Sequence, residues 1–159
     1  MFIDTLRRMK EAQFFALMAL LVAVESILVL VGALPPMMED NIGHSVFFLL
    51  RMAVFISFAC TLVGKPLVHT LLKGAVIALA GIVTQVAFIF IGKATGRVLL
   101  GVVVPSDLVL YLALLISAAI NAVFGAVIVS LSAWILTTLC PKAGTSSKKS
   151  RPAKKGRKR

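Results

Sequence analysis

The stretch that decides the fold is residues 108–139, LVLYLALLISAAINAVFGAVIVSLSAWILTTL, which carries no charged side chain. At about 1.5 Å per residue, a helix of this length is about 48 Å long, which exceeds the bilayer's hydrocarbon core of about 30 Å. Ser106 or Asp107 can cap its first N–H groups, and Pro141 follows its end. We therefore expect a membrane-spanning helix over 107–139 that tilts, kinks or protrudes.

Three further apolar segments precede this one. Unpaired backbone groups are costly in lipid, so runs of about 20 apolar residues cross it as helices. The first run stops at Pro35-Pro36, the second at Gly64-Lys65-Pro66 and the third at Gly92-Lys93, all of which disrupt helix continuation. The short run 98–104 is expected at the interface or partly re-entrant, with a fifth span as the alternative. We expect an all-α, polytopic transmembrane helix bundle with four spans, at 12–34, 45–63, 71–91 and 107–139.

The composition of the whole chain agrees with this fold class. Of the 159 residues, 60% are hydrophobic and 14% are charged, with a mean hydropathy of +1.03. Soluble domains carry about a quarter of their residues charged. The spans leave little chain for a separate soluble module, so we expect one transmembrane domain over 1–141 and a tail over 142–159.

Positive charge is distributed unevenly between the two sides of these spans. Lys and Arg residues of short loops stay on the cytoplasmic side of a membrane. The first residues, the connection after the second span and the tail place most basic residues on one side, and the other side receives only Lys93 and Arg97. We expect a multi-pass protein of the plasma membrane with both termini in the cytoplasm. A cleavable signal peptide ending near Ala33 is the alternative for the first span, although Glu25 within its apolar run argues against it.

Two charged side chains, Glu25 and Arg51, lie well inside the predicted spans, away from their ends. Each costs at least about 2.5–3.5 kcal/mol at the centre of a bilayer, so each requires a partner. Their depths below the outer surface are nearly equal, about 13 Å and about 9 Å at about 1.5 Å per residue. The connection between their helices is short, which suits an antiparallel hairpin. We therefore expect a Glu25–Arg51 contact.

Further polar residues lie in the same outer half of the predicted bundle. Gln85 and Asn121 occur within spans, and His44 lies at the outer mouth. One interpretation is a small binding or proton-responsive site formed by Glu25, Arg51, Gln85 and Asn121. The favoured interpretation is adhesion between helices, because polar side chains bond to one another where lipid offers no partner. His44 is expected to be an interfacial loop residue, since a single histidine makes no metal site.

Small residues predict close helix packing. Small side chains let the backbones of two helices approach each other in membranes. The third span carries Gly74 and Ala78, with Gly81 nearby. Whether the fourth span packs against another span, a protein partner or a second copy in a homo-oligomer stays open. Its candidate packing face recurs at every fourth position and consists of Ala118, Ala122, Ala126 and Ser130.

The tail is basic and contains no apolar residue larger than alanine, so it is expected to be disordered. Basic residues beside an anionic inner leaflet contribute about 1 kcal/mol each, and we expect the tail to bind anionic lipids. A macromolecular partner is the alternative, but nucleic acid is not expected because no aromatic or folded reader accompanies the tail. The lipid-binding residues are Lys148, Lys149, Arg151, Lys154, Lys155, Arg157, Lys158 and Arg159.

No sequence motif in the chain indicates a particular reaction. GxSxG, HExxH, Walker and Rossmann patterns are absent, and the few acids form no pair suited to acid–base or metal chemistry. We expect no enzyme, no catalytic or metal-ligating residue and no cofactor. The favoured function is a non-catalytic scaffold or accessory subunit of a membrane assembly. The alternative is a small-solute transporter or substrate-binding subunit with a polar site around Glu25 and Arg51.

One segment resembles a known family. The run 115–126, LISAAINAVFGA, is similar to the last span of the MreD family of rod-shape scaffold proteins, where an Asn-containing run of small residues also occurs. The resemblance covers a small part of the chain, and the first half lacks the Pro-Asp and Gly-rich, Asp-containing segments of that family. It implies a scaffold related to the cell envelope or cell shape, and no residue role is carried over from it.

Overall fold

The computed structural model describes residues 10–37, 39, 41–101 and 106–139. Within these ranges every regular element is an α-helix, so the predicted all-helical fold class is confirmed. All four helices are long and apolar enough to cross a membrane, which is compatible with a multi-pass integral membrane protein. The tail, including the eight basic residues assigned to lipid binding, lies outside the described residues. The helices are α2 (Glu11–Leu30), α3 (Ile42–Thr61), α4 (Leu67–Ala94) and α5 (Asp107–Leu139).

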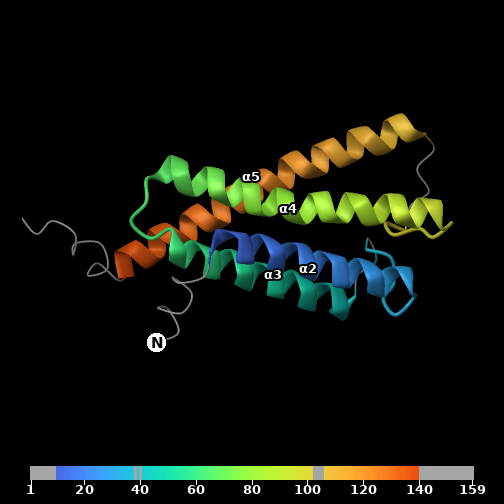
Figure 1. Ribbon diagram of the computed structural model, residues 1–159, viewed down its shortest axis with the longest axis horizontal. Coiled ribbons are helices and arrows are strands. Elements are labelled where there is room, and N and C mark those ends of the chain that lie inside the picture. Colours follow the sequence, from blue (N-terminus) through green and yellow to red (C-terminus); the bar gives the residue numbers. More distant parts are fainter. Residues whose placement is uncertain (1–9, 38, 40, 102–105, 140–159) are drawn as a thin grey trace, which may run out of the picture.

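The helices run back and forth along one long axis (Figure 1). α2 and α3 form an antiparallel hairpin, and α4 contacts α2 along its length. α5 crosses α4 obliquely, so that its carboxyl-terminal half also contacts α3 while its amino-terminal half diverges from the hairpin (Figure 1).

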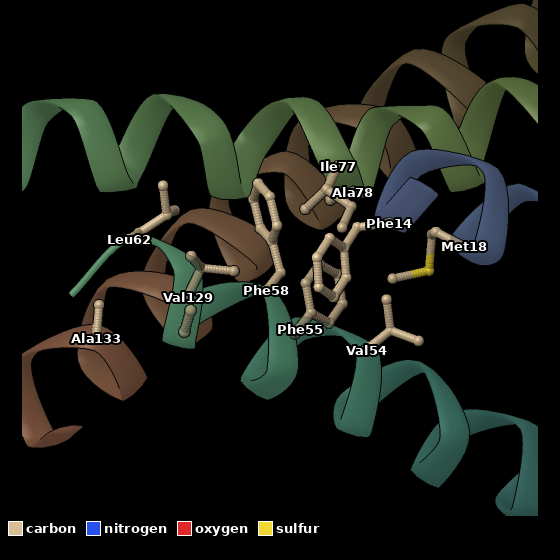
Figure 2. Packing of buried hydrophobic residues seen from close by; sticks show 11 residues of the cluster. Phe14, Met18, Val54, Phe55, Phe58, Leu62, Ile77, Ala78, Val129 and Ala133 are labelled. Atoms are coloured by element: carbon tan, nitrogen blue, oxygen red, sulfur yellow. The ribbon is translucent and has the colours of Figure 1, made fainter. Parts of the chain in front are cut away.

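The main apolar core lies at the end of the bundle where α2 begins and α3 ends. Phe14 and Phe58 stack with ring centroids 5.3 Å apart, and Ile77 and Val129 close the space between the four helices (Figure 2). A smaller core, built on Val29, Ile89, Leu99 and Leu110, lies toward the opposite end.

α4 and α5 meet backbone to backbone at two glycines. A Cβ atom on Gly74 would lie 2.5 Å from the Gly125 carbonyl oxygen and 2.9 Å from Ala126 Cα. On the same side of the crossing, the buried Thr70 Oγ1 and Ser130 Oγ share a hydrogen bond at 3.1 Å. The partner of the small-residue face is therefore α4 of the same chain at Ala126 and Ser130. Ala118 and Ala122, nearer the start of α5, are half-buried.

The predicted boundaries of three helices differ from the structure: α4 covers Leu67–Ala94 rather than 71–91, because it begins directly after Pro66 and continues through Gly92 and Lys93. The ends of α2 and α3 differ for local reasons. α2 ends at Leu30 rather than at residue 34, because Gly32 adopts a left-handed φ of +82° and the N–H of Ala33 bonds to the Leu28 carbonyl oxygen at 2.8 Å. This is the Schellman ending, which glycine favours because it has no Cβ. α3 begins at Ile42 rather than at residue 45, because Asn41 Oδ1 accepts a bond from the Gly43 N–H at 2.7 Å and caps the helix.

The connection before α5 folds back onto the hairpin. Residues 98–101 are not helical, Leu99 is buried, and its carbonyl oxygen accepts a bond from the Met37 N–H at 3.0 Å. The Arg97 guanidinium donates to the Leu30 carbonyl oxygen at the end of α2. Residues 102–105, the rest of the run predicted to be interfacial, lie outside the described residues.

Candidate functional site

A buried carboxylate on α2 forms the centre of the candidate site. Glu25 is only 2% exposed and is the one charged residue that is buried among those the structure describes. Val22 and Val29, one turn before and after it, are buried as well, so this face of α2 points into the bundle. A carboxylate in such a place is tolerated only when both of its oxygens have donors.

Both donors come from α3. Arg51 Nη2 donates to Glu25 Oε2 at 2.7 Å, so the predicted Glu25–Arg51 contact is present. The Arg51 Nε–H also donates to the Phe47 carbonyl oxygen at 3.3 Å, which holds the guanidinium along its own helix. His44 Nδ1 lies 2.8 Å from Glu25 Oε1. We call Glu25, His44 and Arg51 the Glu25 cluster.

The expectation that His44 is an ordinary loop residue was wrong. Because Asn41 caps α3, His44 falls in the first turn of that helix and faces the same side as Arg51 two turns later. Its Nε2 donates to the Pro35 carbonyl oxygen at 3.0 Å, so both ring nitrogens are bonded. The spacing of His44 and Arg51, which places both on one face of a helix, could have predicted that they share a site.

These partners assign a proton to the contact between His44 and Glu25. The Pro35 carbonyl can only accept, so Nε2 carries a hydrogen and a neutral His44 would present a bare Nδ1. A bare Nδ1 and a carboxylate oxygen are both acceptors and would repel at 2.8 Å. One proton therefore lies between them.

A cavity of about 340 Å³ opens beside the Glu25 cluster. Gln85 reaches it from α4, so the structure brings together three of the four predicted polar residues there. Gln85 Nε2 donates to Met37 Sδ at 3.2 Å, and a thioether is a weak acceptor. The cavity is lined by Glu25, Met37, His44, Ser45, Phe48, Arg51 and Gln85.

Asn121 is not brought to this cavity. Its Nδ2 donates to the Ser117 carbonyl oxygen at 2.9 Å, one turn earlier on α5. The described residues that line the cavity all come from α2, α3, α4 and the connection after α2. The amide of Asn121 is therefore bonded within its own helix rather than to the predicted polar layer.

Two ion pairs that the sequence did not indicate join the helices near their ends. Lys73 pairs with Glu11 between α4 and α2, and Lys93 pairs with Asp107 between α4 and α5. All four side chains are at least 28% exposed, and exposed pairs contribute at most about 1 kcal/mol. Within 10–37, 39, 41–101 and 106–139, no group of three or more His, Cys, Asp and Glu side chains could hold a metal ion.

Comparison of the chain with protein-family models, curated proteins and solved structures returned no match. The site therefore has to be interpreted from its own chemistry. That chemistry consists of a buried carboxylate held by two basic side chains, beside a cavity that has both polar and apolar walls.

Proposed function

We propose that this chain is a non-catalytic integral membrane protein that acts as a scaffold or accessory subunit of a membrane assembly. The observation that carries the proposal is the uneven burial of α5. In residues 107–124 only Leu110 is buried, whereas the second half of the helix buries Gly125, Val129, Ser130 and Ala133. The first half of α5 is therefore more exposed than its second half.

The surface of this first half suits a second membrane helix. Its large apolar side chains Leu115, Ile116 and Ile120 are 58–68% exposed. Ala118 and Ala122, on the same half of the helix, are half-buried. Small residues permit close contact between helices in lipid, where packing rather than the hydrophobic effect drives association. The resemblance of this segment to MreD supports a scaffold and suggests a role at the cell envelope.

A site-specific crosslink tests the scaffold. A photoreactive amino acid at Ile120, which is 63% exposed on α5, is expected to capture a stoichiometric partner that also co-purifies with the tagged chain in mild detergent. The matched control is the same group at Leu49, which is 65% exposed on α3. Equal capture from both positions, or no stoichiometric partner, would contradict the scaffold. Capture of a second copy of the chain would define it as a homo-oligomer.

We also propose that the protein lies in the plasma membrane with both termini in the cytoplasm, and that its tail binds anionic lipids. The support is the basic charge on one side of the spans. After Cys60 and Cys140 are replaced by serine, Ser106→Cys is expected to react with an impermeant maleimide in intact cells, and Lys65→Cys only after lysis. Both positions are exposed. Reversed labelling would overturn the orientation, and labelling of both from one side would overturn the four spans.

The cavity favours a second candidate function, a small-solute transporter or substrate-binding subunit. Its volume of about 340 Å³ lies within the range of small-molecule sites, about 300–1,000 Å³. Charged and amide groups meet apolar side chains in its wall, as small-molecule sites require. A scaffold alone has no use for such a space.

A further inference from the structure

The Glu25 cluster carries a net positive charge beside the cavity. Glu25 contributes one negative charge and Arg51 one positive charge, and the proton in the His44–Glu25 contact adds a second positive charge. Gln85, the residue that faces the cluster from α4, is neutral. The charged groups that line the cavity therefore sum to a single positive charge, which favours an anion over a cation.

The guanidinium of Arg51 has donors left for such an anion. Among the described residues it donates from Nε to Phe47 and from Nη2 to Glu25, which occupies one edge of the group. The hydrogens on Nη1 and the second hydrogen on Nη2 form the other edge. Two parallel N–H groups of this kind match the two oxygens of a carboxylate, and the Arg51 side chain is 28% exposed at the cavity wall.

The other residues that line the cavity favour one chemical class of anion. Ser45 and the Gln85 amide can donate further hydrogen bonds, while Phe48 and Met37 provide apolar surface. A fully hydrated inorganic ion would leave that apolar surface unused. A small carboxylate with an apolar body would use both parts of the wall.

We propose that the cavity binds a small monocarboxylate. The outer edge of Arg51 donates hydrogen bonds to its carboxylate group, and the proton shared by His44 and Glu25 keeps the site positively charged. This inference names the ligand class of the second candidate function and rests on the cavity rather than on the scaffold.

The test uses the full chain in lipid nanodiscs and benzoate as the probe, followed by calorimetry. Benzoate is expected to bind at least about tenfold more tightly than benzamide, which has the same shape without the charge. In His44→Gln, which cannot carry the proton, benzoate is expected to bind at least about fivefold more weakly.

Variants separate the cavity from nonspecific binding. Arg51→Gln is expected to abolish binding, and because this variant can also disturb folding, Gln85→Leu and Phe48→Trp change the wall without altering any charge. Both are expected to weaken benzoate binding at least about fivefold. Arg97→Gln is the matched control, since Arg97 bonds to Leu30 and does not line the cavity.

Each result decides the proposal. Absent binding, equal affinity for benzamide, or unchanged affinity in both Gln85→Leu and Phe48→Trp would overturn it. Benzoate uptake into proteoliposomes then distinguishes the functions. Binding without uptake supports the carboxylate site and removes the transporter, whereas uptake supports both.

Discussion

Replacing Arg51 by glutamine is expected to lower the free energy of unfolding by about 3–5 kcal/mol, the cost of breaking a buried ion pair from one side. The variant leaves the carboxylate of Glu25, only 2% exposed, without its strongest donor in a region that lipid surrounds. Because Glu25→Gln removes the stranded charge, the double variant is expected to recover part of the loss. Reversible unfolding of the chain in detergent mixtures measures all three proteins.

A matched control for this prediction lies at the other end of the bundle. Glu11→Gln breaks the Lys73–Glu11 pair, whose side chains are 28% and 43% exposed. Water screens such a pair, so the expected loss is below about 1 kcal/mol. Similar losses for Arg51→Gln and Glu11→Gln would show that the Glu25 cluster is no more than a surface pair.

Adding one methyl group at the crossing of α4 and α5 is expected to destabilise the bundle by about 1–3 kcal/mol, the usual cost of overpacking. In Gly74→Ala the new Cβ lies 2.5 Å from the carbonyl oxygen of Gly125. A backbone carbonyl cannot rotate away as a side chain does, so the two helices must separate. The same unfolding measurement reports the effect.

Gly81→Ala on the same helix provides the comparison. Its Cβ would meet Met18 Cγ at 3.3 Å, and this flexible side chain can shift. Alanine also reduces the entropy of the unfolded chain relative to glycine, so we expect a change close to zero or a small gain in stability. Equal effects at Gly74 and Gly81 would contradict the backbone contact.

The parts of the fold that were predicted correctly depend on strong local signals. Long apolar runs located the helices because lipid leaves the backbone no other way to satisfy its polar groups. The Glu25–Arg51 contact followed from matched depths in a hairpin with a short connection. The fourth helix was placed at 107–139, as the structure has it, because Asp107 precedes an apolar run without a charge.

The parts that were not predicted depend on contacts between distant residues or on single backbone angles. Pro35 was taken as the end of the first helix, yet the left-handed Gly32 ends it earlier. The role of His44 depends on the cap at Asn41, which decides whether the histidine is helical. The pattern of apolar residues did not predict that α5 crosses α4 obliquely, because α5 is apolar on nearly every side.

The arrangement of the Glu25 cluster has a consequence for biosynthesis. Both donors to Glu25 belong to α3, and α2 offers none of its own among the described residues. When the nascent chain reaches the translocon, α2 alone would enter lipid with a bare carboxyl group, at a cost of about 2.5–3.5 kcal/mol. Pairing with α3 supplies the two donors, so α2 and α3 are expected to enter a bilayer more favourably as a pair than α2 alone.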